Sequence, residues 1–279
     1  MLKLQKWNQI QNHYGGVNIA DRIITRLQLA GCDLDKLNTD DTAKFDEFHG
    51  GGRDSTLALA KFANISPGKR ILDIGSGVGG PARTLAEKYR CQVTGLELTA
   101  EFISAGKMLT ELLGMLGVVE FVQASATEIP FKAEMFDVVW SQNMLMNVQD
   151  KEKLFAEVYR ITKPGGMLAF ETIVAGPGGP LHFPTFWAAD SSMNFLESSE
   201  KLCNLITAAG FNQRKFEDTT NAVIENGRRR LKAANAANCM ELDLSVIVKC
   251  AVAEKMENSV CNNIEGRTRA VQGLFQRLD

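Results

Sequence analysis

The strongest chemical signal in the sequence is a glycine-rich turn after a short apolar segment, Leu72-Asp73-Ile74-Gly75-Ser76-Gly77-Val78-Gly79-Gly80. Glycines let a ligand approach the backbone, and the N-terminus of a helix that follows presents free N–H groups. Gly75, Gly77 and Gly80 also satisfy G-x-G-x-x-G, the dinucleotide fingerprint. The turn alone leaves three interpretations open: an NAD(P) site, an S-adenosylmethionine (SAM) site, and a packing turn without a ligand.

Two acidic residues near this turn narrow the choice. Glu97 follows the next apolar segment, where a carboxylate can accept hydrogen bonds from two ribose hydroxyls. Both cofactors carry such a ribose, so Glu97 does not separate them. Asp73 stands two positions before the first glycine, where dinucleotide folds usually have an apolar residue. A carboxylate there suits a ligand with an ammonium group and no pyrophosphate, which favours SAM.

An alternation of strands and helices from Arg70 onward predicts the scaffold for these residues. Strands are expected over 70–74, 92–96, 119–123, 136–141 and 167–173, and helices from the glycine turn to about residue 89, over 100–115 and over 150–161. Residues 164–166, Pro-Gly-Gly, are expected to form a turn. Such alternation indicates an α/β fold in which helices cover both faces of a parallel sheet.

The segments outside this alternation look helical or loop-like. Before it, we expect a helix over 17–30, a loop over 46–52, and a helix from an N-cap at Asp54 to residue 63. After it come a Gly/Pro-rich loop over 176–190, a helix over 198–209, a strand over 214–218, mostly helical residues over 220–257 and a final strand over 269–277.

Several motifs together resemble the class I SAM-dependent methyltransferases: Ile71–Gly77, Glu97, Phe136–Trp140 and Lys163–Gly166. Three further segments look like the small-molecule branch around sarcosine/dimethylglycine N-methyltransferases: Asp46–Gly51, Gly79–Arg83 and Gly176–Ala188. That branch also contains natural-product and quinone methyltransferases, so it does not fix the substrate. The resemblance implies a Rossmann-like, seven-stranded, mostly parallel sheet whose last strand is antiparallel, with helices on both faces and a helical cap.

The resemblance also divides the chain into four parts. Residues 1–65 form a helical N-terminal cap or lid, and 66–218 form the SAM-binding core with a substrate loop over 176–195. Residues 219–266 form a helical insertion, and 267–279 return as the final strand of the core sheet.

The same resemblance assigns the cofactor site. The backbone of Gly75, Ser76, Gly77 and Gly79 lies along the methionine part of SAM, and Asp73 helps to hold its ammonium group. Glu97 takes the ribose hydroxyls, and the other expected cofactor-binding residues are Leu98, Thr99, Ser125, Ala126, Ser141, Gln142 and Arg83. Ser125 and Ala126 stand where the family commonly has an acid for the adenine amino group, which puts that contact in doubt. Gln142 as a solvent-facing amide and Arg83 as an ordinary ion-paired arginine stay open.

Catalytic candidates are few, because methyl transfer from a sulfonium is an in-line displacement that needs no acid for the leaving thioether. A base is needed only if the nucleophile must lose a proton. His49 is the main candidate for a base or a substrate-orienting residue, with Tyr14 in a lid and His182 beside Phe186 and Trp187 as further candidates. Each can instead be structural. No His/Asp/Glu cluster has ligand spacing, so no metal is expected.

Composition limits the remaining functions. Lys plus Arg is 31 and Asp plus Glu is 33, so the formal charge of −2 argues against a nucleic-acid partner. No segment suits a membrane span, and six scattered cysteines without a C-x-x-C motif favour a cytoplasmic location. We expect a small-molecule substrate and leave a homodimer open. The alternatives are an NAD(P)-dependent oxidoreductase and a SAM-fold protein that acts as a cyclase or binding scaffold without methyl transfer.

Overall fold

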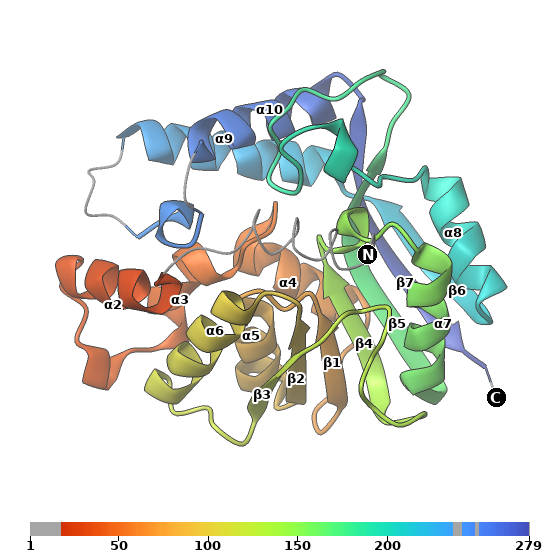
Figure 1. Ribbon diagram of the computed structural model, residues 1–279, viewed down its shortest axis with the longest axis horizontal. Coiled ribbons are helices and arrows are strands. Elements are labelled where there is room, and N and C mark those ends of the chain that lie inside the picture. Colours follow the sequence, from red (N-terminus) through yellow and green to blue (C-terminus); the bar gives the residue numbers. More distant parts are fainter. Residues whose placement is uncertain (1–17, 237–241, 249–250, 279) are drawn as a thin grey trace.

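A seven-stranded sheet organises the described part of the computed structural model, which comprises residues 18–236, 242–248 and 251–278. The strand order is β3-β2-β1-β4-β5-β7-β6 (Figure 1). The strands are β1 (Arg70–Ile74), β2 (Gln92–Glu97), β3 (Val119–Gln123), β4 (Phe136–Gln142), β5 (Thr162–Ala175), β6 (Phe211–Asp218) and β7 (Thr268–Arg277). Neighbours from β3 to β5 pair in parallel, whereas β7 pairs antiparallel with both β5 and β6. The predicted fold class is therefore confirmed.

Helices cover both faces of this sheet. The α-helices of the described residues are α2 (Ile19–Leu29), α3 (Thr39–Asp46), α4 (Gly52–Phe62), α5 (Gly80–Tyr89), α6 (Ala100–Leu112), α7 (Lys151–Ile161), α8 (Ser199–Ala208), α9 (Thr220–Ala236) and α10 (Val252–Ile264). Successive strand residues face opposite sides, so Leu72 of β1 packs in one core with Phe155 of α7 and Ile206 of α8. Its neighbour Ile71 packs in a second core with Leu85 of α5. Burial on both faces explains why the central strands are almost continuously apolar.

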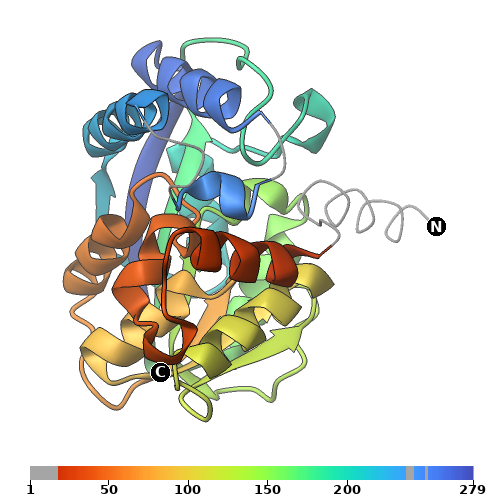
Figure 2. The ribbon, with the colours of Figure 1, turned by 90° about the vertical axis from the view of Figure 1, so that its left-hand side faces the viewer.

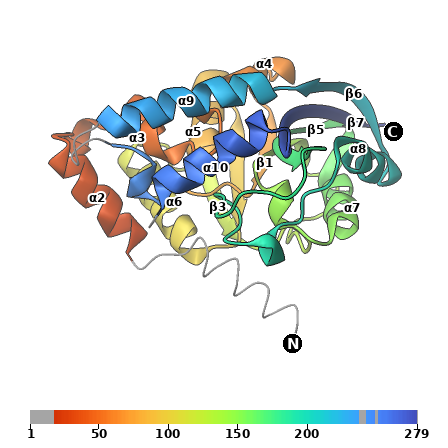
Figure 3. The ribbon, with the colours of Figure 1, turned by 90° about the horizontal axis from the view of Figure 1, so that it is seen from above.

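Two groups of helices lie beyond the carboxyl ends of the strands. Ile23 of α2 and Phe45 of α3 share a third core with Leu109 of α6 and with Val246 of the short 3-10 helix η4 (Leu244–Val246). The helices α9 and α10 run side by side above the sheet (Figures 1 and 3). Figure 2 shows both groups from the side, with α2 in front and the α9–α10 pair at the top. We call these two groups, α2 with α3 and α9 with α10, the cap. In open α/β sheets a ligand binds outside the carboxyl ends of the strands, which is the side that the cap covers.

Two local predictions were wrong. The expected turn over 164–166 is part of the continuous strand β5, because the extra residues form a bulge: Phe136 pairs with Thr162 but Val138 pairs with Met167. Gly165 absorbs the distortion with φ of 71°. The helix expected to begin after an N-cap at Asp54 begins three residues earlier, at Gly52, and the N-cap position is held by Gly51.

No helix in the described part of the chain is both long enough and apolar enough to cross a bilayer.

Candidate active site

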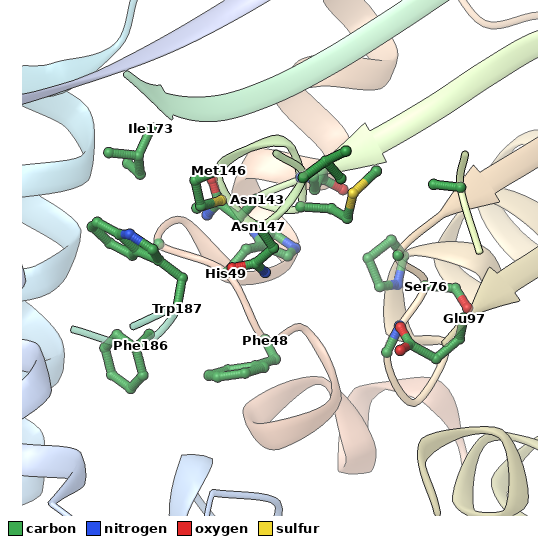
Figure 4. Close-up of a pocket in the computed structure, with 18 of the residues that line it drawn as sticks. Phe48, His49, Ser76, Glu97, Asn143, Met146, Asn147, Ile173, Phe186 and Trp187 are labelled. Atoms are coloured by element: carbon green, nitrogen blue, oxygen red, sulfur yellow. The ribbon is translucent and has the colours of Figure 1, made fainter. Parts of the chain in front are cut away.

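A cavity of about 540 Å³ lies at the carboxyl ends of β1, β2 and β4. The predicted site residues on its wall are Asp73, Gly75, Ser76, Gly77, Glu97, Leu98, Ser125, Ala126, Gln142 and His49. Figure 4 shows Ser76 and Glu97 on one side of the cavity and the aromatic residues Phe48, Phe186 and Trp187 on the other. The cavity therefore has a polar half made by the glycine turn and an apolar half.

The glycine turn reaches the cavity because its backbone adopts conformations that other residues avoid. Gly75 has φ of 76°, and a Cβ there would lie 2.4 Å from Cγ of Met144. The Gly75 N–H donates to Leu96 O over 2.8 Å, which ties the turn to the neighbouring strand. The turn then enters α5 directly, with Pro81 in the first turn of the helix. The sequence thus places a bare backbone segment against the polar half.

Asp73 and Ser76 bring unpaired polar atoms to this half. Asp73 is 1% exposed, and among the described residues neither its Oδ2 nor the Ser76 Oγ has a hydrogen-bond partner. Burial, followed by the negative charges of Glu47 and Glu97, raises the pKa of Asp73 to about 8. A buried polar atom without a partner is costly, so this pair is suited to a ligand that brings a cation and hydrogen-bonding groups.

Glu97 is held in one orientation by three backbone N–H groups. Its Oε2 accepts from Gly77 over 3.0 Å, and its Oε1 accepts from Leu98 over 2.8 Å and from Thr99 over 2.9 Å. Burial raises the pKa of this carboxyl despite these bonds. A carboxylate has about four lone-pair positions, so capacity remains for a hydroxyl of a ligand in the cavity.

His49 lies in the cavity wall within a buried hydrogen-bond network. Its Nε2 is 3.0 Å from Glu47 Oε2, and its Nδ1 is 3.2 Å from Ser55 Oγ. Ser55 in turn donates to Glu171 Oε1 over 3.0 Å. Burial acts to raise the pKa of Glu47, but hydrogen bonds led by His49 outweigh it and hold that pKa below its usual value. Both imidazole nitrogens therefore have protein partners, and one of those partners is an ionised carboxylate.

Gln142 belongs to the same network. Its Oε1 accepts from Thr56 Oγ1 and from Trp140 Nε1, each over 3.0 Å, and its Nε2 donates to Ser55 Oγ over 3.2 Å. The amide lines the cavity, but its oxygen and nitrogen form hydrogen bonds with other side chains of the protein. These bonds hold the cavity wall beside His49 in place. Neither of the two interpretations drawn from the sequence, a ligand contact and a solvent-facing amide, describes this role.

The structure places Arg83 away from the cavity wall. This arginine is 1% exposed, and its Nη2 donates to Asp46 Oδ2 over 2.9 Å and to Val78 O over 2.8 Å. Its Nη1 donates to Thr110 Oγ1 over 3.1 Å. This geometry matches the ion-paired arginine that the sequence left open: the partner of Arg83 is Asp46, which itself lines the cavity.

Other predicted residues also lie behind or outside the wall. Thr99 and Ser141 are buried, and Ser141 Oγ donates to Ile74 O over 3.3 Å. Gly79 caps α5, with a φ of 86°. The His182 side chain is 42% exposed, and its Nε2 lies 2.9 Å from Glu265 Oε2 outside the cavity lining, so its catalytic role stays a prediction. Tyr14 lies outside the described residues.

The apolar half combines residues that the sequence suggested with residues that it did not. Phe186 and Trp187 line it as expected, and Phe48 meets Phe186 edge to face with ring centroids 5.6 Å apart. Sequence reasoning missed the contribution of α9 and α10, whose cavity-lining residues are Val223, Gly227, Arg230, Met256, Ser259, Val260 and Asn263. The i, i+4, i+7 spacing in each helix was the available signal.

Asn143 is a further residue that the sequence did not single out. It follows β4 with φ of 51°, lines the cavity, and has a buried Oδ1 that finds no hydrogen-bond partner in the described part of the chain. A left-handed non-glycine residue at a ligand cavity is a common sign of a functional position. Elsewhere in the described chain, no three His, Cys, Asp or Glu side chains gather as a metal site would require.

Comparison with known proteins identifies the central segment. Residues 72–170 match the methyltransferase domain family. Phosphoethanolamine N-methyltransferase 1 of Zea mays is 31% identical over 170 residues, which cover 61% of this chain and 33% of that protein. Glycine/sarcosine/dimethylglycine N-methyltransferase of Actinopolyspora halophila is 38% identical over 112 residues, which cover 40% of this chain and 20% of that protein.

The solved structures agree with this match at the level of the fold. The structure of Haemonchus contortus phosphoethanolamine N-methyltransferase 2 has a TM-score of 0.74 at 19% identity, and the match covers 97% of this chain and 61% of that one. The matched part of this chain spans about a third of the maize relative's length, 33%. The match of residues 72–170 to the methyltransferase domain family, together with these relatives, confirms the predicted resemblance to SAM-dependent methyltransferases.

Proposed function

We propose that this chain, whose residues 72–170 match the methyltransferase domain family, transfers the methyl group of SAM to N, O or C of a small-molecule acceptor. The observation that carries the proposal is the pair of unpaired, buried polar atoms on Asp73 and Ser76, beside the bare backbone of the glycine turn. An ammonium group close to Asp73 would satisfy that carboxylate and remove the cost of burying it.

The polar half of the cavity fits SAM. Asp73 would hold the ammonium group, Gly75 to Gly77 would lie along the methionine part, and Glu97 would accept hydrogen bonds from ribose hydroxyls. Leu98 and Ser125 would flank the adenine. The pyrophosphate of NAD(P) would instead meet the carboxyl of Asp73 within a low-dielectric wall, which counts against the oxidoreductase alternative. Related structures with SAM or S-adenosylhomocysteine bound support the same cofactor.

Methyl transfer from SAM depends mainly on how the acceptor atom is positioned relative to the methyl group. When bound, SAM supplies a methyl group activated by its sulfonium, and the acceptor atom must lie in line with the carbon–sulfur bond. The aromatic and aliphatic residues of the apolar half exclude water and hold the acceptor body, which fixes that alignment. Orientation of this kind can account for about 7–11 kcal/mol of a reaction barrier.

His49 acts as the base, or as the residue that orients the acceptor, when the acceptor carries a proton. The ionised Glu47 accepts a hydrogen bond from Nε2–H, so the neutral imidazole presents Nδ1 as its acceptor nitrogen. Proton uptake at Nδ1 would give an imidazolium stabilised by Glu47 and by Glu171, whose Oε1 lies 3.9 Å from Nδ1. Ser55 Oγ lies 3.2 Å from Nδ1 and must move aside for the acceptor's proton to reach that nitrogen directly; Ser55 already donates to Glu171 Oε1 over 3.0 Å.

S-adenosylhomocysteine release tests the function directly. Purified chain is incubated with SAM and panels of amines, phenols and carbon acids, and the expected result is release that depends on one class of acceptor. Affinity for NADH without affinity for SAM would contradict the proposal. SAM binding without release from any panel would favour a cyclase or a binding scaffold.

The proposal extends to the setting in which the enzyme works. A cytoplasmic location is supported by the described cysteines, Cys32, Cys91, Cys203 and Cys261, which are all free thiols. A small-molecule acceptor is supported by a concave, mainly apolar site, and the balanced charge gives no reason to expect a nucleic-acid partner. Sedimentation of the purified chain distinguishes a monomer from the homodimer that the sequence left open.

A further inference from the structure

The helices of the cap present one arginine to an otherwise mostly apolar part of the cavity. Val223, Gly227 and Arg230 of α9 line it at i, i+4, i+7 spacing, opposite Met256 and Val260 of α10. The two helices pack closely here, because a Cβ on Gly227 would lie 2.6 Å from Cγ2 of Val260. Arg230 therefore enters the cavity from a tightly packed helix pair and not from a loose surface.

Arg230 has donors to spare. Its Nη1 donates to His49 O over 3.1 Å, and no described carboxylate lies within ion-pair distance of its guanidinium. A guanidinium has five N–H donors and stays protonated in proteins. Burial lowers the pKa of Arg230, while the more distant charges of Glu47 and Asp54 act to raise it. Within the described residues, this is a cation in an apolar wall without a counter-ion.

The second cation on the wall differs from Arg230 in both respects. Lys153 pairs with Glu128 over 2.9 Å, and its side chain is 44% exposed. It has a counter-ion and solvent, so it does not call for a charged ligand. Arg230 has no described counter-ion and is less exposed to solvent than Lys153. Burying a charge without a partner is costly.

We propose that Arg230 binds an anionic group, a carboxylate or a phosphate, on an acceptor whose body is apolar. The inference rests on the proposed function, because it concerns the acceptor of that same cavity. A guanidinium binds either anion through two parallel N–H···O bonds. Phe48, Phe186 and Trp187 supply apolar surface for the acceptor body.

The charges of the cavity give this arrangement a direction. The polar half carries the carboxyl groups of Asp46, Asp73 and Glu97, which offer an anion no positive charge. Arg230 attracts it on the side of the cap. An amphipathic anion would therefore enter with its charge toward α9, which leaves the other end of the molecule to face the glycine turn.

Arg230 could instead serve only to hold α9 against the loop before α4. Asn226 makes such a contact, because its Nδ2 donates to Gly51 O over 3.1 Å. Substitutions distinguish anion binding by Arg230 from a role in holding α9 in place. Arg230→Gln keeps a donor for His49 O and removes the charge, whereas Asn226→Ala removes the neighbouring contact and keeps the charge. Arg229→Gln removes a charge from the exposed face of the same helix.

Calorimetry with four probes whose apolar chains have seven or eight carbons tests the inference. Full-length chain saturated with S-adenosylhomocysteine is titrated with octanoate, octyl phosphate, octanol and octylamine. We expect at least one of the two anions to bind at least tenfold more tightly than octanol or octylamine, and Arg230→Gln to reduce that ratio to within twofold. Asn226→Ala and Arg229→Gln should keep the wild-type ratio. Comparison of octanoate with octyl phosphate shows which anion fits better.

Three results would overturn the inference. Octanol or octylamine could bind wild-type chain as tightly as both anions, or Arg230→Gln could keep the preference. Alternatively, Arg230→Gln could weaken S-adenosylhomocysteine binding tenfold, which would assign the guanidinium to the cofactor. Absence of S-adenosylhomocysteine binding to wild-type chain, measured before any probe is added, would instead overturn the proposed function together with this inference. Failure of the probes alone leaves the proposed function standing.

Discussion

Substitution of Asp73 by Asn should make the chain more stable and at the same time unable to bind SAM well. In the free protein the Asp73 carboxyl has a pKa of about 8, raised chiefly by burial. An unfolded chain would ionise it near pH 3.9. The folded pKa lies above the unfolded one, so the folded chain binds the extra proton. The resulting contribution to stability is complete below about pH 4 and is lost as pH rises to about 8.

The magnitude follows from the same pKa. Each unit corresponds to about 1.4 kcal/mol, so the difference of about four units costs on the order of 5 kcal/mol of stability at pH 8. Asn cannot ionise and keeps nearly the same shape. The Asp73→Asn variant should therefore equal wild type near pH 4 and exceed it increasingly up to pH 8. For a chain of this size, a few kcal/mol raises the melting temperature by roughly 5–15 °C.

Thermal unfolding at pH 5, 6.5 and 8, paired with SAM titration at pH 7, is the assay. The SAM affinity of the variant should fall by about 10²-fold, since a charge-assisted bond to the ammonium group is lost. The reasoning is refuted if the difference in melting temperature does not grow with pH. It is equally refuted if the variant binds SAM within twofold of wild type.

Three further substitutions test other parts of the site. Glu97→Ala should weaken SAM binding by tenfold or more, because charge-assisted bonds to ribose hydroxyls are worth about 1.5–3 kcal/mol; unchanged affinity by calorimetry would refute that placement. His49→Ala should lower kcat, by about 10²-fold or more if the imidazole is the base, with little change in SAM affinity; intact turnover would make His49 structural. Gly75→Ala should destabilise the chain by about 1–2 kcal/mol or more, because its Cβ would meet Met144 at a positive φ, and normal melting with normal SAM binding would contradict this.

The glycine turn and its strands could be predicted because their signals are local. An apolar strand, a glycine-rich turn and a helix follow one another within 20 residues of sequence, and β1 and β3 begin and end where the pattern indicated. The bulge in β5 could not be foreseen, because Pro-Gly-Gly is typical of turns and only pairing with β4 shows that the strand continues through it.

Side-chain roles that depend on distant partners were the least predictable. Arg83 stands beside the glycine turn in sequence, yet its position is set by Asp46, 37 residues away, in a buried ion pair. His182 lies in the predicted substrate loop, but Glu265 beyond α10 holds it at the surface. Arg230 could not be singled out, because the sequence does not show which face of α9 packs over the cavity.

Calorimetric titration of SAM at pH 7, in two buffers of different ionisation enthalpy, tests the central claim most directly. With a pKa of about 8, Asp73 is mostly protonated in the free chain and must ionise to hold an ammonium group. The account predicts that SAM binds and that close to one proton is released per chain. No binding, or binding without proton release, would contradict it.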